Sequence, residues 1–128
     1  MTIKTSRRDA VIDITDRVQK LVNEEEIENG VTTLFVKHTT CGITTADLDP
    51  GTDKDFLEAL RHLLPKLEYR HPHDPEHAPD HILSSIIGPS LSVPIIEGKL
   101  SLGTWQKIVL VELAGPRERE IEVILQEV

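Results

Sequence analysis

The chain has 128 residues, with 14 Lys and Arg against 22 Asp and Glu, so its formal net charge is −8. This acidic balance argues against a nucleic-acid partner, since phosphate contacts need a basic face, and four aromatic residues leave little for base stacking. No apolar run approaches the roughly 20 residues that cross a bilayer, and the N-terminus lacks the apolar core of a signal peptide. We therefore expect a single cytoplasmic domain over residues 1–128, without a membrane partner.

The first half of the chain begins with a predicted strand at Ala10–Ile14 and a helix from Thr15 to about Ile27. Thr15 or Asp13 is the expected N-cap of this helix, and Asn29 followed by glycine is its stop signal. The β-branched run Val31–Lys37 predicts a second strand, and a further β-rich piece follows at 43–45. Three predicted strands thus precede the second helix.

Two more helices are predicted in the middle of the chain. Five apolar residues between Phe56 and Leu64 share one face, and Thr52 with Asp55 predicts a variant capping box before them. The third helix is expected to begin at Pro79, which suits a first-turn position, and to stop at Gly88–Pro89.

Three strands are predicted near the C-terminus, at 90–96, 107–113 and 120–126. Strands at both ends with helices between them favour an α+β fold, an antiparallel two-layer β-sandwich with about three short helices. The strand at 107–113 reads KIVLVEL, which predicts burial on both faces. Such a strand needs a second layer, either another sheet or a partner subunit.

Histidines are the first candidate functional residues. His38 directly follows a strand, where a rigid element positions a side chain and the next loop leaves it accessible. A solvent-exposed histidine at a strand end explains this pattern equally well. His71 and His73 flank a proline that favours extended backbone, so both rings can share one face and bind a metal ion together, or lie free in solvent.

His81 is expected in the first turn of the third helix, where the helix dipole disfavours the imidazolium form. A neutral ring suits a metal ligand or a hydrogen-bond donor, whereas the alternative is a purely local structural role. His77 lies four residues earlier, but Pro79 places it outside the helix, which removes a two-histidine metal face.

The only tryptophan lies in the block Gly103-Thr104-Trp105-Gln106, where an apolar wall adjoins hydrogen-bonding groups. This combination suits a small polar ring as ligand, although Trp105 as a central packing residue of an aromatic-poor core explains it equally well.

Glu112 lies within an apolar strand, where a carboxylate is costly unless it is paired. Arg117 and Arg119 are candidate partners for it. The same two arginines can instead bind an anionic substrate, because a guanidinium matches phosphate oxygens. Cys41, the only cysteine, is expected to be a small buried residue rather than a nucleophile.

Motifs over nearly the whole chain resemble the YjbQ-like family, whose members are often named secondary thiamine-phosphate synthase enzymes. The matching residues, in chain order, are His38-Thr39-Thr40, Ile43-Thr44, Asp49-Pro50, Asp55, Tyr69, His71, His81-Ile82, Ser84-Ser85, Gly88, Pro94, Gly98, Leu102 to Gln106, Glu112, Gly115 to Arg117 and Arg119. Many members have Asn-Glu where this chain has Ala46-Asp47, so the acidic role falls on Asp47 or Asp49.

The resemblance implies an antiparallel β-sandwich that assembles as a homotrimer, with a histidine-lined pocket at the subunit interface. It also implies a divalent metal, zinc rather than magnesium, held by His38, His71 and His81. The expected catalytic residues are His38, His71, His81 and Glu112. The expected contacts to a phosphorylated small-molecule substrate are Thr39, Asp49, Thr104, Trp105, Gln106, Arg117 and Arg119.

The implied reaction joins a pyrimidine-methyl diphosphate to a thiazole phosphate and releases pyrophosphate. Two other functions stay open at this point: a protein that binds a metal or small ligand without turnover, and a metal-assisted hydrolase of a phosphorylated small molecule.

Overall fold

The structure is a computed structural model that describes residues 1–128. Its strands are β1 (Thr2–Lys4), β2 (Ala10–Asp13), β3 (Gly30–Val36), β4 (Cys41–Ala46), β5 (Ser90–Ile96), β6 (Lys99–Leu100), β7 (Lys107–Glu112) and β8 (Glu118–Glu127). Its helices are α1 (Thr15–Glu24), α2 (Thr52–Leu63) and α3 (Ala78–Ile87), and a single 3₁₀ turn, η1 (Pro75–His77), leads into α3. None of these helices is long and apolar enough to cross a bilayer.

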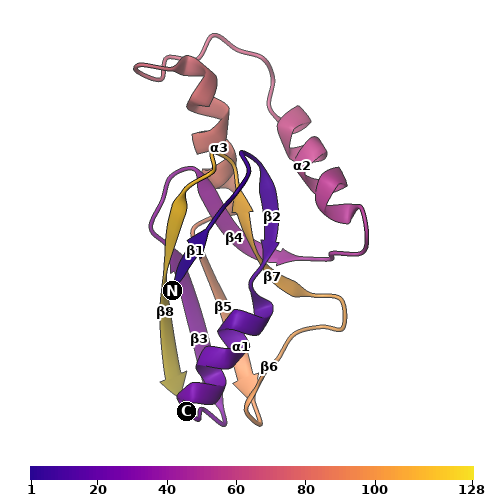
Figure 1. Cartoon of the computed structure of the whole chain (residues 1–128), viewed down its shortest axis with the longest axis vertical. Coiled ribbons are helices and arrows are strands. Elements are labelled where there is room, and N and C mark those ends of the chain that lie inside the picture. Colours follow the sequence, from indigo (N-terminus) through magenta and orange to yellow (C-terminus); the bar gives the residue numbers. More distant parts are fainter.

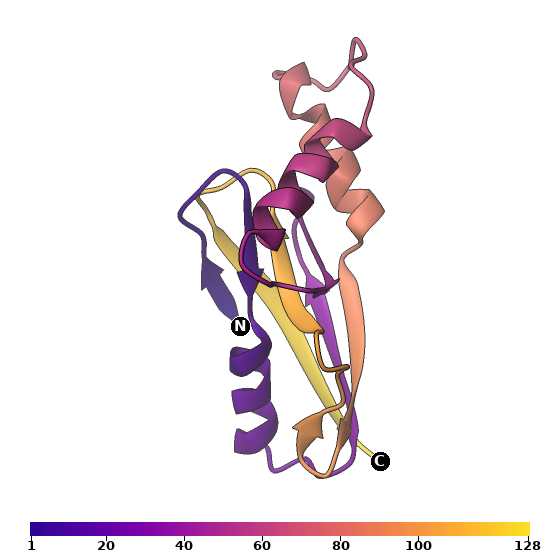
Figure 2. The ribbon, with the colours of Figure 1, turned by 90° about the vertical axis from the view of Figure 1, so that its right-hand side faces the viewer.

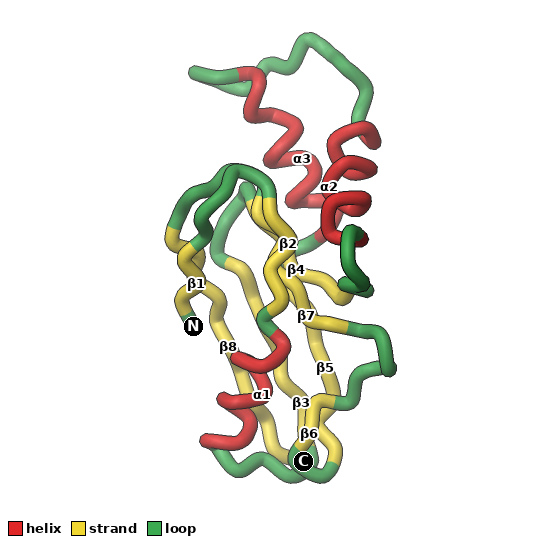
Figure 3. Tube along the Cα trace, turned by 45° about the vertical axis from the view of Figure 1, so that its right-hand side comes forward, coloured by secondary structure: helices red, strands yellow, loops and turns green.

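The strands form two antiparallel sheets (Figure 1). The larger sheet has the order β1-β8-β3-β5-β6, and the smaller sheet has the order β2-β7-β4. The helices α2 and α3 lie beyond one end of the larger sheet, and α1 lies toward the other end (Figure 3). This arrangement confirms the predicted α+β class and the antiparallel two-layer sandwich with three short helices.

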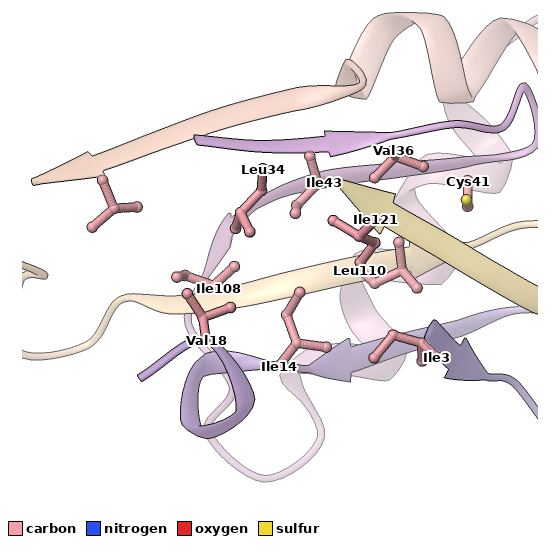
Figure 4. Close-up of a cluster of buried hydrophobic side chains, with 11 residues drawn as sticks. Ile3, Ile14, Val18, Leu34, Val36, Cys41, Ile43, Ile108, Leu110 and Ile121 are labelled. Carbon is pink, nitrogen blue, oxygen red and sulfur yellow. The ribbon is translucent and has the colours of Figure 1, made fainter. Parts of the chain in front are cut away.

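The central strand β7 is buried on both faces, as its apolar sequence predicts. Ile108 and Leu110 pack between the two sheets, beside Leu34 and Ile121 of the larger sheet (Figure 4). Val109 and Val111 point to the opposite face of β7 and pack with apolar residues of α2 and α3. The cover that β7 needs therefore comes from a second sheet on one face and from helices on the other, all within one chain.

α3 is held closely against β4, which fixes one end of the molecule. The Ser84 hydroxyl donates to the Cys41 carbonyl at 2.7 Å, and the Ile43 N–H donates to the Gly88 carbonyl at 3.0 Å. Gly42 permits this approach, because a Cβ there would lie 2.7 Å from a side-chain carbon of Ile87.

Two helix boundaries differ from those predicted. α1 ends at Glu24, before the expected end near Ile27, because Glu26 adopts a left-handed φ of 53°. The capping box predicted to start at Thr52 is absent: Gly51, with a φ of 90°, occupies the N-cap position of α2, and no side chain caps the helix.

The start of α1 follows the prediction more closely. The Asp13 carboxylate accepts hydrogen bonds from the backbone N–H and the hydroxyl of Thr15, although the N-cap position itself is Ile14. The short edge strands β1 and β6 were not predicted, since two or three residues carry no periodicity.

Candidate functional site

A cleft of about 520 Å³ opens where the loop after β3, the start of β8 and the N-terminal turn of α3 meet. The cationic side chains that line it are Lys37, Arg117 and Arg119. Five histidines also line it, namely His38, His71, His73, His77 and His81, whereas Asp74 is the only acidic residue. Lys37 pairs with Glu122 and Arg119 with Glu112, so Arg117 is the cation of the lining without an ion-pair partner, and N–H donors dominate the cleft.

His38 is held in the cleft by the neighbouring strand. Its Nε2 accepts a hydrogen bond from the backbone N–H of Glu120, in β8, at a donor–acceptor distance of 2.8 Å. Burial lowers the pKa of His38 below its ordinary value of 6.5, and the nearby charge of Arg119 lowers it further. The ring is therefore neutral at pH 7, and its proton is on Nδ1 because Nε2 is an acceptor.

His71 and His81 form a pair across the cleft. Their ring centroids lie 4.6 Å apart with an interplanar angle of 46°. His71 comes from the loop between α2 and η1, and His81 is the fourth residue of α3. All three histidines that the sequence predicted for one site thus line this cleft, and two of them, His71 and His81, are in ring contact.

His77 has a structural role in the same cleft. Its Nδ1 lies 3.0 Å from the Asp80 carboxylate and its Nε2 lies 3.1 Å from the Asp74 carboxylate. Both ring nitrogens are thus occupied, and the contacts tie η1 to α3. His77 also lies outside α3, at its N-cap position, as Pro79 predicted.

The predicted metal site of His38, His71 and His81 does not fit this arrangement. No three histidine, cysteine or acidic side chains are placed so that they can hold one ion together. A ligating imidazole must offer a lone pair. The Nε2 lone pair of His38 is taken by Glu120, and Nδ1 carries the proton. The cleft is therefore built as a set of donors rather than as a preformed zinc centre.

Glu112 lies beneath the cleft and does not line it. Its side chain is fully buried and pairs with both Nε and Nη2 of Arg119. It also accepts hydrogen bonds from the Thr5 hydroxyl at 2.7 Å and from the backbone N–H groups of Leu113 and Ala114 at 3.0 and 3.1 Å. The expectation that Glu112 is catalytic is therefore not supported, because every polar contact that it makes is internal.

Glu112 is ionised in this environment. Burial raises its pKa, but the hydrogen bonds from Arg119, Thr5 and the Ala114 N–H outweigh that effect, and the net pKa lies below the ordinary value. Its role is to hold Arg119, which is 2% exposed.

The two predicted arginines have different roles. Arg119 pairs with Glu112 and also donates from Nη2 to the hydroxyl of Thr40 at 2.9 Å, at the edge of the cleft. Arg117 is exposed, and its Nε donates to the Ala114 carbonyl at 2.9 Å. The terminal nitrogens of Arg117 make no hydrogen bond or ion pair within the chain, so this arginine can bind an anion in the cleft. Thr39 lines the cleft beside them, as expected.

A second ion-pair network, which the sequence did not reveal, supports the cleft from outside. Asp80 is completely buried in the first turn of α3, and its carboxylate binds Arg61 of α2 at 2.5 Å and Arg8 at 3.5 Å. Arg61 also contacts Asp9 at 2.5 Å and the Leu113 carbonyl at 2.8 Å. This network locks α2, α3 and the β1–β2 loop together.

Four of the predicted substrate contacts lie elsewhere in the chain, namely Asp49, Thr104, Trp105 and Gln106. The register of β4 on β7 pairs Cys41 with Glu112 at the cleft end and Ala46 with Lys107 at the other end. The two ends are separated by about 17 Å of strand. Gln106 contacts Thr45 at that far end, so these four residues and the histidines do not share one pocket within a chain.

Trp105 is 69% exposed, which also excludes it as a central core residue.

Cys41 is buried beside Arg119, and burial raises its pKa to about 11. Its thiol is therefore protonated at neutral pH and is not a nucleophile, as expected.

Comparison with known proteins gives a consistent result over the whole chain. The model of the family described as "UPF0047 protein YjbQ-like" matches residues 1–127. The chain belongs to the YjbQ-like family. A UPF0047 protein of Methanocaldococcus jannaschii is 38% identical over 122 residues, which are 94% of this chain and 88% of that protein. The UPF0047 protein YugU of Bacillus subtilis is 38% identical over 120 residues, 93% of this chain and 91% of that protein.

Solved structures of the family have the same fold. A YjbQ-like protein of unknown function from Sulfolobus solfataricus superposes with a TM-score of 0.92 at 35% identity, over 99% of this chain and 94% of that one. An uncharacterized YjbQ/UPF0047 protein of Clostridium acetobutylicum gives a TM-score of 0.89 at 38% identity, over 98% of both chains. These names state a family and no activity. The family predicted from the motifs is thus confirmed, whereas the synthase activity implied with it is not.

Proposed function

We propose that this YjbQ-like chain is an enzyme that acts on a phosphorylated small molecule, with the phosphoryl group bound in the histidine cleft. One observation carries this proposal. Five histidines and Arg117, which has no ion-pair partner, line a space of about 520 Å³ in which Asp74 is the only acidic lining residue. Guanidinium and imidazole N–H groups are donors that match phosphate oxygens. The bound group is therefore an anion, and a small phosphorylated molecule is of the right size for the space.

The specific reaction that we propose is the one implied by the family resemblance. The carbon–oxygen bond between a pyrimidine-methyl group and its diphosphate breaks, and pyrophosphate leaves with the electron pair. The thiazole nitrogen supplies the electron pair of the new carbon–nitrogen bond. Positive groups placed where charge develops on the leaving oxygen lower the barrier for such a step. Arg117 is the residue of this chain that can supply such a charge, because the charge of Arg119 is neutralised by Glu112.

This reaction is tested by mixing the two substrates with purified protein and measuring the pyrophosphate released. The variant is Arg117→Met, and its matched control is Arg17→Met on α1, which removes the same charge away from the cleft. We expect release by the parent and the control, and at least about a tenfold loss for Arg117→Met, because charge-assisted hydrogen bonds are removed. Substrate binding without release would instead indicate a binding protein without turnover.

A growth test addresses the same chemistry in cells. His38→Ala and His81→Ala remove two cleft histidines and are tested for rescue of a strain that cannot make thiamine. We expect both to rescue less well than the parent. If both variants rescue as well as the parent, the cleft does not perform this chemistry.

We further propose that the chain works as a homotrimer. The outer face of the larger sheet is left uncovered in one chain, since α1 lies on its opposite side (Figure 2). Phe35, Ile96 and Ile124 are 46%, 54% and 54% exposed, and all three alternate with inward-facing residues of their strands. Ile124 lies diagonal to Phe35, and Ile96 lies toward the other end of the same face, so exposed apolar side chains are spread along it, as is typical of a subunit interface. Sedimentation at micromolar concentration tests this, and a monomer would contradict it.

A trimer also offers a role for Trp105, which lies away from the histidines of its own chain. We propose that it belongs to the substrate pocket of a neighbouring copy, so that each complete site needs two chains. The proposal is supported by its 69% exposure next to hydrogen-bonding residues that the same loop holds in place.

A further inference from the structure

His38 makes one contact that determines how it can meet a ligand. Its Nε2 accepts the hydrogen bond of the Glu120 backbone N–H at 2.8 Å. A backbone N–H is always a donor, so the nitrogen that faces it must carry a lone pair and no proton. The only neutral tautomer compatible with this contact has its proton on Nδ1.

The donor that sets this tautomer is itself rigid. Glu120 lies in β8, opposite Thr2 of β1 in the strand pairing. Its backbone carbonyl accepts a hydrogen bond from the Lys37 N–H at 3.2 Å. His38 follows β3, the other strand that pairs with β8. The register of two paired strands therefore fixes the tautomer, and no mobile side chain is involved.

The His38 ring makes a hydrogen bond within the chain only at Nε2, which leaves Nδ1 without a hydrogen-bond partner, and the residue lines the same cleft as Arg117 and Arg119. From this we infer that His38 binds the phosphoryl group as a neutral donor through Nδ1–H, and not as a metal ligand. This inference rests on the proposed function, because it assumes that an anion occupies the cleft. Beyond the proposed function, it specifies that Nδ1 of His38 contacts the phosphoryl group and that the ring is neutral.

Metal binding through either nitrogen of His38 would be costly. A metal at Nε2 would displace the Glu120 N–H, which would lose its partner. A metal at Nδ1 would have to replace the proton there while Nε2 remains an acceptor, which leaves an imidazolate. His71 and His81 have no such restriction, because neither ring has a hydrogen bond within the chain. The inference is therefore specific to His38.

The first arm of the test is a long-range ¹H–¹⁵N correlation spectrum of the ligand-free protein at pH 7, which distinguishes the two neutral tautomers. We expect His38 to be protonated on Nδ1. Protonation on Nε2 would overturn the inference, whether or not an anion binds. A Zn²⁺ titration belongs to this arm, and a shift of both His38 and the Glu120 amide on adding Zn²⁺ would also overturn it.

The second arm uses two variants that preserve one nitrogen position each. The amide of His38→Asn lies near the place of Nδ1, whereas the longer His38→Gln reaches the place of Nε2. We expect His38→Asn to bind inorganic phosphate within about threefold of the parent and His38→Gln to bind about tenfold more weakly, since it lacks the donor to the charged ligand. Thermal melts of both variants establish that they are folded.

The outcomes separate the two claims. If the parent binds phosphate and His38→Gln binds it equally well, the role of His38 is wrong while the proposed anion site stands. If the parent does not bind phosphate, the proposed function fails, and the anion contact of His38 fails with it. The spectrum of the parent still decides the tautomer if one variant does not fold.

Discussion

Arg119→Met is the substitution whose cost follows most directly from the structure. Glu112 is completely buried and Arg119 is 2% exposed, and the two side chains pair through two guanidinium nitrogens. Methionine preserves most of the apolar stem of arginine but removes the charge. The carboxylate of Glu112 would then be buried and ionised without its cation. Removal of one partner from a buried ion pair costs about 3–5 kcal/mol.

That cost is a large part of the stability of a small domain, which is typically about 5–15 kcal/mol. Glu112→Gln supplies the matched partner, since it removes the opposite charge with little change of shape. In the double variant Glu112→Gln/Arg119→Met no buried charge is left uncompensated. We therefore expect the double variant to lose about 2–3 kcal/mol less than the sum of the two single variants.

Urea unfolding at pH 7 measures the free energy of unfolding of the parent, the two single variants and the double variant. The same measurements at lower pH give an independent check. The folded-state pKa of Glu112 is lowered, so its contribution to stability is present above the unfolded value of 4.5 and is lost as the pH falls through the folded pKa. The deficit of Arg119→Met relative to the parent should therefore shrink at acidic pH.

Two results would contradict a coupled, buried Glu112–Arg119 pair. One is a loss below about 1 kcal/mol for Arg119→Met at pH 7, the size expected of an exposed ion pair. The other is strict additivity of the two single variants, which would mean that Glu112 and Arg119 do not depend on each other.

Three further predictions concern the surroundings of the cleft. Arg61→Met, which breaks the contacts to Asp9 and Asp80, should cost about 2 kcal/mol and speed hydrogen exchange in α2, and unchanged exchange would contradict the network. Trp105→Ala should change the unfolding free energy of the chain by less than about 0.5 kcal/mol, and a larger loss would mean that the indole is packed in the fold. His38 should titrate below 6.5 in an NMR pH series, because burial lowers its pKa and the charge of Arg119 lowers it further. Its contribution to the stability of the fold should therefore be complete above pH 6.5 and should be lost as the pH falls through the folded-state pKa. A midpoint above 6.5 would contradict that environment.

The sequence predicted those features that depend on local pattern. The run Lys107–Leu113 indicated a strand buried on both faces, and the structure buries Ile108 to Val111 completely. Glu112 within that strand indicated a buried ion pair, and the structure supplies Arg119 as its partner. In each case the residues themselves carry the physical requirement, either burial of apolar surface or neutralisation of a buried charge.

Features that depend on strand register could not be predicted in this way. The Glu120 N–H that fixes His38 is 82 residues away along the chain, and it reaches the ring only because β3 and β8 pair with one particular register. Trp105 and the histidines were expected to share one pocket. They lie at opposite ends of the β4–β7 pair, a consequence of register that no local motif records.

The Asp80 network illustrates the same limit. In the sequence, an aspartate in a first helical turn indicates only a favourable interaction with the helix dipole. Its burial depends on Arg61 and Arg8 reaching it from two other segments of the chain. Tertiary packing, rather than local spacing, thus decides which charged residues support the site.

The central claim is that the cleft binds a phosphoryl anion, and calorimetric titration of the parent with pyrophosphate at pH 7 tests it most directly. We expect saturable binding with one site per chain, about tenfold weaker in Arg117→Met and unchanged in Arg17→Met. Absence of saturable binding to the parent, or equal weakening by the two arginine variants, would contradict it.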